Sequence, residues 1–353
     1  MTKLLLLLLP LLVARAAGGG GCAPAAPAAA AAAAPGSWVL TFEDDFDGDA
    51  LNTSSWTVAD RDATKSQYDG HDAVYLAENI AVANGSLIIS TAWAPQTLDG
   101  IAYNFSSGWV DTQGKRNQTR GRWEASMRMP AGGNGVGDGP TGAWPAWWLL
   151  PGSCWPIGGE VDILEYYVGE GHYQHSRTDN PPQYSASYHY GERAPACSAA
   201  LASSAQGPTS SSPAPPPPPP SGYGCGNDLY RYPNDTQWFP SGNWTPNFPI
   251  IDYTADFHVF GVEINDTALR FYSENASNTV FTIAAPSLCV DNPDFVYGES
   301  MYLPFSPLYG ILEVAVNAQR TTNVTWWLHN TAKTYVDWVR FWEFQPAEAA
   351  VEV

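Results

Sequence analysis

Three acidic residues, Glu160, Asp162 and Glu165, stand close together in an otherwise apolar segment of the chain. Side chains of a regular strand alternate between its two faces, so Glu160 and Asp162 share a face while Glu165 would point the other way. One β-bulge residue between Asp162 and Glu165 corrects this phase. We therefore expect a bulged strand that presents all three acids on one face and its apolar residues to the core.

Three carboxylates crowded on one sheet face repel each other, and at least one should keep its proton near neutral pH. Two carboxyl groups with separated proton affinities are what glycoside hydrolysis uses, because one attacks the anomeric carbon while the other protonates the leaving oxygen. Retention of configuration requires them to lie roughly 5–5.5 Å apart. The alternative is a solvated acidic edge strand, in which the charges prevent aggregation.

The elements that must position these acids are strands. The chain has 353 residues, of which 13% are aromatic, and its 32 glycines and 30 prolines disfavour long helices. The segment 121–129 alternates, with Arg122 and Glu124 on one face and Trp123 and Ala125 on the other. Evenly spaced short strands of this kind predict an antiparallel β-sandwich. Arg122 and Glu124 are candidates for either a binding groove or a sheet edge.

The charge of the chain excludes one broad class of partner. Its formal net charge is −19, from 16 basic and 35 acidic residues. An acidic chain without a basic stripe repels phosphate backbones, so we expect no nucleic-acid binding. The hydrophobic fraction of 44% is too high for a disordered chain.

The N-terminus has the features of a secretory signal peptide. Lys3 is a positive n-region, residues 4–13 are an apolar h-region, and residues 14–16 have the small-x-small form of a cleavage site. Ten apolar residues are too few to cross a bilayer as a helix, so we expect no stable membrane insertion once the signal is removed. A membrane anchor and a lipoprotein modification at Cys22 are the alternatives.

We divide the chain by composition. The predicted parts are a signal peptide at 1–16, a Gly/Ala/Pro tail at 17–36, a single β-domain at 37–345 with a Pro-rich surface insert at about 198–224, and a C-terminal tail at 346–353.

Sequons and cysteines also indicate the secretory pathway. Nine Asn-x-Ser/Thr sequons occur, at Asn52, Asn84, Asn104, Asn117, Asn234, Asn243, Asn265, Asn275 and Asn323. Cysteine pairs are suggested at 197 with 225 and at 154 with 289, although sequence cannot set the connectivity. No Cys-x-x-Cys or His-rich spacing suggests zinc.

Further motifs follow the order of a known family. The bulged pattern Glu-x-Asp-x-x-Glu resembles the signature of the laminarinase-type members of glycoside hydrolase family 16. Matching segments lie on both sides of it, at 42–48, 107–109, 121–124, 142–151, 188–191, 257–260 and 336–340. The resemblance covers about 38–344, apart from the Pro-rich insert.

The resemblance implies an all-β fold, a curved antiparallel β-sandwich (jelly roll) with a concave substrate groove. It also implies endo-hydrolysis of β-1,3-linked glucan with retention. Carried over by position, Glu160 resembles the nucleophile and Glu165 the general acid/base. Asp162 resembles the middle residue that orients the nucleophile and adjusts proton affinity.

Four further residues resemble substrate-binding positions of the family. Trp148 and Trp155 resemble groove tryptophans, whose flat indoles cover the apolar face of a sugar ring. Trp144 is either groove wall or core. His189 resembles a histidine near the acid/base, and its alternative is a purely structural role.

No cofactor is required for this chemistry. Some members of the family carry a structural calcium, and the Gly85 carbonyl and Asp337 match positions of such a site, with the oxygen ligands that calcium prefers. Two departures from the family bear on substrate subclass. Glu313 stands where relatives usually have Asn, and Asn317-Ala318 stands where they usually have Gly-Gly.

Together these features predict a secreted, extracellular or cell-wall glycoside hydrolase, active as a monomer on a β-glucan polysaccharide. A transglycosylase that remodels cell-wall β-glucan shares the first half-reaction and is one alternative. A non-catalytic β-glucan-binding recognition protein on the same scaffold is the other.

Overall fold

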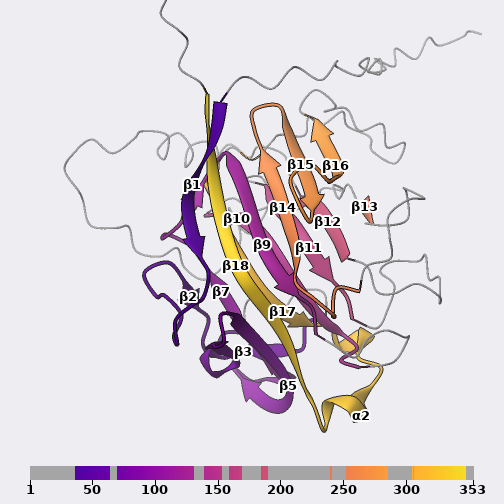
Figure 1. The fold of residues 1–353 in the computed structure, drawn as a ribbon. Helices are drawn as coiled ribbons and strands as arrows, with labels where there is room; N and C mark the ends of the chain where they lie inside the picture. Colours follow the sequence, from indigo (N-terminus) through magenta and orange to yellow (C-terminus); the bar gives the residue numbers. More distant parts are fainter. Residues whose placement is uncertain are drawn as a thin grey trace, which may run out of the picture.

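A computed structural model of the chain describes residues 36–63, 70–130, 139–152, 159–168, 184–189, 239–240, 252–284, 304 and 306–346. In these ranges the regular structure is almost entirely β-strand, arranged in two sheets (Figure 1). The predicted all-β fold is therefore confirmed. Among the described residues, the first strand begins at Gly36 and the last strand ends at Pro346.

The larger sheet has ten strands, and the long strand β18 (Thr331–Pro346) runs through it (yellow in Figure 1). The strand order is β16 (Thr279–Ala284), β15 (Ala268–Ser273), β14 (His258–Ile264), β9 (Gly121–Arg128), β18, β5 (Leu87–Leu98), β6 (Ile101–Ser107) and β3 (Ala73–Tyr75). In addition, β1 (Gly36–Asp44) pairs with β18, and β4 (Ile80–Val82) pairs with β5. The pair β3 and β6 is parallel, which departs from the purely antiparallel sandwich that the sequence predicts.

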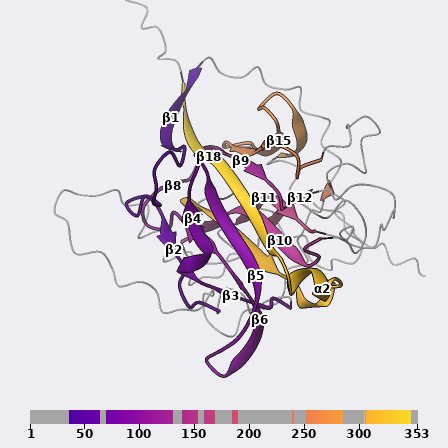
Figure 2. The same ribbon diagram turned by 60° about the horizontal axis from the view of Figure 1, so that its bottom comes forward.

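The smaller sheet has eight strands. The order is β13 (Phe239–Pro240), β12 (Tyr184–His189), β11 (Glu160–Tyr166), β10 (Ala143–Pro151), β17 (Leu308–Val316), β7 (Trp109–Asp111) and β2 (Thr57–Val58), and β8 (Asn117–Gln118) pairs with β17. Helical segments in the described ranges are short: η2 (Ala77–Asn79), η3 (Ala318–Arg320) and α2 (Val324–Trp327). The last two lie in the connection from β17 to β18 (Figure 2).

The two sheets pack together through one apolar core that the alternation of the strands creates. On β9, Trp123, Ala125 and Met127 are fully buried, whereas Arg122 and Glu124 on the other face are half-buried. The predicted alternation of this segment is therefore confirmed. From the smaller sheet, Trp147, Leu149, Val161 and Leu312 enter the same core. Each sheet thus has one face in the core and one outer face.

Gly310 on β17 allows the two sheets to approach. A Cβ atom at this position would lie 2.7 Å from Cη2 of Trp147 and 3.1 Å from Cζ of Phe341. These two rings are fully buried and stack across the core at 6.3 Å, so they have little room to move. Close packing of this kind makes an added methyl group costly.

We expect Gly310→Ala to lower the free energy of unfolding by about 1–3 kcal/mol, measured by denaturant titration. The matched control is Gly152→Ala, because nothing lies within 4 Å of a Cβ at that position. The control should change stability by less than about 0.5 kcal/mol. Equal losses in the two variants would contradict this account of the core.

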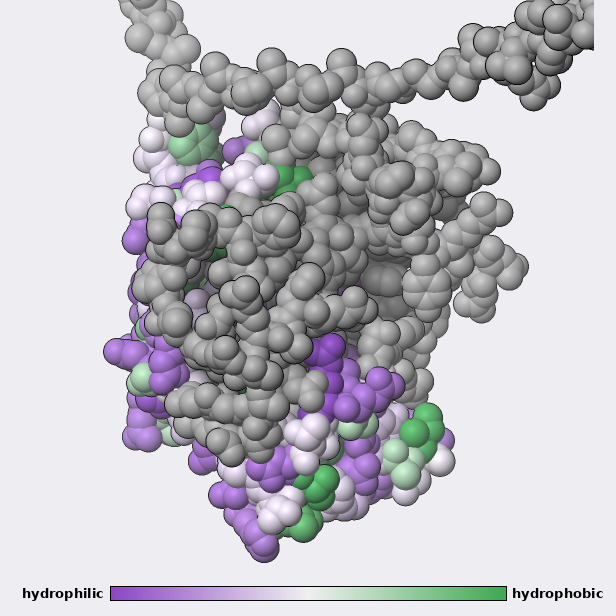
Figure 3. Space-filling view, turned by 90° about the vertical axis from the view of Figure 1, so that its right-hand side faces the viewer, coloured by the Kyte–Doolittle hydropathy of each residue, from purple (hydrophilic) through white to green (hydrophobic). Residues whose placement is uncertain are grey.

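The described part of the surface carries both polar and apolar residues. Figure 3 shows hydrophobic residues as small separate groups among hydrophilic ones on the described part of one face. No helix in the described ranges is long and apolar enough to span a bilayer. The predicted signal peptide, the Pro-rich insert and all five cysteines lie outside the described residues.

Candidate active site

The bulged strand predicted for the three acids is present in β11. Its register with β12 pairs Glu160 with His189 and Asp162 with Ser187, then shifts before Glu165 pairs with Ser185. The extra residue allows Ile163 and Leu164, which are adjacent in sequence, both to enter the core. This restores the phase of Glu165, as a β-bulge does.

All three acids therefore belong to the outer face of the eight-stranded sheet, which we call the acid face. Asp162 is opposite Trp148 in the register, and Glu165 is opposite Ala146. Directly opposed residues of an antiparallel pair project from the same face. Asp162 is only 4% exposed, whereas Glu160 and Glu165 are half-buried and reach solvent at the edge of the site. The alternative of a solvated edge strand is wrong, since β11 is paired on both sides.

Each of two acids accepts hydrogen bonds from neighbouring side chains. The Tyr167 hydroxyl donates to Oε1 of Glu165 at 3.0 Å, and Oγ of Ser185 donates to Oε2 of Glu165 at 3.4 Å. Oγ of Ser187 donates to Oδ2 of Asp162. These donors fix the carboxylates from the β12 side and from the end of β11, so the acids are held rather than mobile.

Tyr167 is a donor that keeps its proton. Burial raises the pKa of Tyr167 well above its usual range, and the negative charge of Glu165 raises it further. The ring packs at 4.6 Å against Trp144, and the Arg320 guanidinium lies 4.8 Å from its centre. The phenol is therefore protonated, and able to donate to Glu165, across the pH range in which proteins stay folded.

The structure places two of the predicted groove tryptophans on the acid face. Trp144 and Trp148 alternate along β10, share the face of Asp162 by register, and are half-buried. The indole nitrogen of each is buried, and within the described residues no hydrogen-bond acceptor contacts it. Trp148 also packs edge-on against Trp109 at 5.4 Å.

The other two predicted binding residues are Trp155 and His189. Trp155 lies outside the described residues. The backbone of His189 pairs with Glu160, which puts the residue beside the proposed nucleophile, while its side chain is not among those described.

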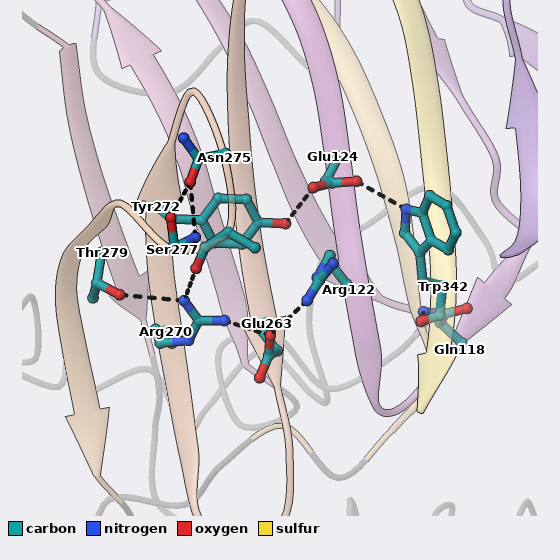
Figure 4. A network of polar contacts seen from close by, with 11 residues as sticks. Gln118, Arg122, Glu124, Glu263, Arg270, Tyr272, Asn275, Ser277, Thr279 and Trp342 are labelled. Atoms are coloured by element: carbon teal, nitrogen blue, oxygen red, sulfur yellow. Dashed lines mark hydrogen bonds and ion pairs between the residues drawn. The ribbon is translucent and has the colours of Figure 1, made fainter. Parts of the chain in front are cut away.

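Arg122 and Glu124 do not belong to this site. They lie on the outer face of the ten-stranded sheet, separated from the acids by the core. Glu124 accepts hydrogen bonds from the Tyr272 hydroxyl and from the Trp342 indole, each at 2.8 Å, and thereby links β15, β9 and β18 (Figure 4). Arg122 pairs with Glu263 in the same network. Both residues have a structural role.

Sequence reasoning missed several residues that line or support the acid face. Ser185 and Ser187 were visible as serines at every second residue of β12, the spacing of one strand face. Tyr167 stands two residues after Glu165, which is again the spacing of one strand face. Arg320 is far away in sequence, and only the fold brings it near.

A second apolar cluster covers part of the acid face. It contains Trp109, Leu150, Tyr309 and Ile311 from the smaller sheet together with Tyr75 from β3, and Trp148 packs against it. We call this cluster the aromatic wall. It buries the β7 and β17 side of the face, whereas Glu160, Glu165, Trp144 and Trp148 are half-buried.

Gly85 and Asp337, the residues of the calcium prediction, lie at the same end of the pairing between β5 and β18. Val336 pairs with Leu87, Asp337 is the bulged residue that follows, and Gly85 forms the turn before β5. Oγ of Ser126 lies 3.5 Å from Oδ2 of Asp337. The oxygen donors suit calcium. Among the described residues, however, no group of three or more His, Cys, Asp or Glu could hold a metal, so the calcium stays a prediction.

Comparison with known proteins supports the resemblance. No family model matches the sequence. A beta-glucanase of Rhodothermus marinus is 34% identical over 140 residues, which are 36% of this chain and 44% of that protein. The catalytic domain of the Thermotoga maritima laminarinase superposes with a TM-score of 0.59 at 18% identity, covering 87% of this chain and 98% of that domain. A non-specific endo-beta-1,3(4)-glucanase from glycoside hydrolase family 16 gives 0.57 at 18% identity, covering 90% and 94%.

The resemblance to family 16 is confirmed. Superposition at 18% identity establishes a laminarinase-like fold, and the sequence match to a glucanase is independent of it. The chain spans about half or less of the length of the curated relatives that it matches.

Proposed function

We propose that this chain is a secreted, retaining endo-β-1,3-glucanase that hydrolyses laminarin-type β-glucan. The observation that carries the proposal is the bulged strand β11, which presents Glu160, Asp162 and Glu165 on one outer sheet face. The two half-buried carboxyl groups, those of Glu160 and Glu165, suit the two roles of a retaining glycosidase. The names of two relatives, a beta-glucanase and a laminarinase, agree with it.

In the first step, the Glu160 carboxylate attacks the anomeric carbon, and the glycosidic bond to the leaving sugar breaks. Glu165 gives its proton to the leaving oxygen. The result is a covalent glycosyl ester on Glu160 and an ionised Glu165, whose charge the Tyr167 and Ser185 donors stabilise. The buried Asp162 lies between the two glutamates along β11 and accepts a hydrogen bond from Ser187. Its role is to orient Glu160.

In the second step, a water molecule replaces the leaving sugar. The Glu165 carboxylate takes a proton from this water while its oxygen attacks the anomeric carbon. The ester bond to Glu160 breaks, so both residues return to their starting forms. Two displacements on the same carbon give net retention.

Sugar binding falls to the half-buried residues of the acid face beside the aromatic wall. The half-buried indoles of Trp144 and Trp148 offer apolar surface to sugar rings. Both rings lie along β10, next to the acids of β11. A polymer lying along the face would cross both strands.

Surface sequons support secretion. Of the nine sequons, the asparagines at 52, 84, 104, 117, 265 and 275 are exposed and Asn323 is half-buried. Three of them form compact turns in which the asparagine Oδ1 accepts from the hydroxyl two residues later, namely Asn52, Asn265 and Asn275. Glycans at these positions would not disturb the core.

The test is to incubate the purified chain with laminarin, lichenan and agarose and to measure reducing ends and product lengths. We expect laminarin to be cut into products of several lengths from the start of the reaction. A chain that is inert on all β-glucans would refute the proposal. Tight laminarin binding without cleavage would indicate a recognition protein, and longer oligosaccharides made from a short labelled donor would indicate a transglycosylase.

Replacing Tyr167 by phenylalanine should move the alkaline limb of the pH–rate profile upward by about 0.5–1 pH unit. The phenol donates to Glu165 and stabilises its ionised form, so without it Glu165 releases its proton at higher pH. The measurement is kcat/KM on laminarin against pH. A limb that stays in place or moves to lower pH would contradict the assigned role of Glu165.

A further inference from the structure

A fourth carboxyl group lies on the acid face. Glu313 of β17 is opposite Ala146 in the register, and Ala146 is opposite Glu165 on its other side. The row Glu165, Ala146, Glu313 therefore projects from one face of three neighbouring strands. Because alanine contributes only a methyl group, no larger side chain of this row stands between the two glutamates.

Glu313 is fixed at the border of the aromatic wall. It is only 6% exposed. The Tyr75 hydroxyl donates to its Oε2 atom, and Tyr75 itself is fully buried against Trp109 at 5.6 Å. Burial disfavours the ionised form of a carboxyl group, and a phenol that donates its one hydrogen to a carboxyl oxygen acts in the opposite sense and stabilises the ionised acid. The effective dielectric constant around a buried carboxylate is lower than that of water, so its charge interacts more strongly with other charges.

The other ionisable groups near this row are few within the described residues. On β11 and just beyond it are Glu160, Asp162 and Tyr167, and Asp111 lies on β7. Arg320 of η3 faces Tyr167, and the His71 ring packs at 5.0 Å against Trp144. Asp62 forms a backbone bridge with Tyr75. Tyr75 and Tyr309 belong to the aromatic wall, and the backbone of His189 is opposite Glu160.

We propose that Glu313 is a positioning residue whose negative charge, held by Tyr75, keeps the acid/base Glu165 protonated near neutral pH. The proposal rests on the role of Glu165 in the proposed function. A like charge nearby disfavours ionisation, so Glu313 raises the pH at which Glu165 loses its proton. Tyr167 acts in the opposite sense, and the balance of the two sets the pH range in which Glu165 is an acid.

The expected shift of the Glu165 titration midpoint follows from the sheet geometry. Two strand spacings separate the Cα atoms of Glu165 and Glu313 by about 9.6 Å. With an effective dielectric constant of about 20, a unit charge at that distance changes proton affinity by about one pH unit, and solvent screening reduces this. We therefore expect Glu313→Gln to lower the titration midpoint of Glu165 by about 0.5–1 pH unit.

The experiment measures that midpoint directly, by ¹³C NMR of protein labelled at the glutamate carboxyl carbons. The Glu165 signal is assigned by its loss in Glu165→Gln. The alkaline limb of the pH–rate profile on laminarin should fall by the same amount as the midpoint. If the unaltered chain cleaves no glucan, the proposed function fails, while the NMR titration still tests the coupling between the two glutamates.

Glu124→Gln is the matched control. Glu124 also accepts a hydrogen bond from a tyrosine hydroxyl on a neighbouring strand, and it lies on the outer face of the other sheet. The control should leave the Glu165 midpoint within about 0.2 pH unit, because the core separates the two groups. An equal shift in both variants would show a general effect of net charge and overturn the proposal.

Tyr75→Phe is the second variant, used as well in case Glu313→Gln does not fold. Without the phenol, ionised Glu313 loses a stabilising donor, so the Glu165 midpoint should again fall. If Glu313→Gln folds and the Glu165 midpoint is unchanged, Glu313 has only a structural role in the aromatic wall. If only Tyr75→Phe folds, an unchanged midpoint in that variant leads to the same conclusion.

Discussion

Replacing Glu160 by glutamine should lower kcat/KM on laminarin by at least about 10⁴-fold. The amide has the size of the carboxylate but cannot form the glycosyl ester, so the first step loses its nucleophile. Glu160 is half-buried at the start of β11 and lies on the acid face. The substitution therefore removes chemistry with little change in packing.

The control for Glu160→Gln is Glu124→Gln, which makes the same change on the outer face of the other sheet. It should retain near-normal activity, although the lost contacts to Tyr272 and Trp342 should lower the melting temperature. The measurements are reducing ends released from laminarin and thermal unfolding. If Glu160→Gln keeps more than about a tenth of the activity, another residue is the nucleophile.

The second large effect is expected from Glu165→Ala. Loss of the general acid should reduce cleavage of laminarin by about 10²–10⁴-fold. An aryl β-glycoside of a β-1,3-linked oligosaccharide should be affected less in its first step, because its phenolate leaves without protonation. The covalent intermediate on Glu160 should then accumulate, since water is no longer deprotonated for the second step.

Added azide separates retention from inversion in the Glu165→Ala variant. Azide is a nucleophile that needs no base, so it should restore turnover of the aryl glycoside and give a β-glycosyl azide. This product requires two displacements, first by Glu160 and then by azide. An α-glycosyl azide, which forms by one direct displacement, would show that Glu160 is not the nucleophile and that the mechanism is not retaining.

Much of the site could be predicted from the sequence because it depends on the spacing of residues within single strands. The spacing of Glu160, Asp162 and Glu165 indicated both the shared face and the bulge, and β11 has both. Alternation in segment 121–129 likewise gave the buried face of β9. Period and spacing depend only on the strand backbone, so a single segment contains the whole signal.

Residues that lie far apart in sequence could not be assigned in this way. Arg122 and Glu124 show the same polar alternation as a groove strand, and only the pairing of β9 with β14 and β18 puts them in the other sheet. Glu313 was visible as an unusual acid in a buried strand, but its partner Tyr75 is 238 residues away. Sequence spacing contains no information about such a contact.

The sequence by itself determined the strand character, the acidic row on β11 and the resemblance to a family, because these depend on neighbours within one segment. Only the tertiary structure decided which sheet holds each strand, which side of the acid face the aromatic wall closes, and which carboxyl groups share a row. Those features depend on strand order and register, and strand order and register are set by the burial of both sheets in one common core.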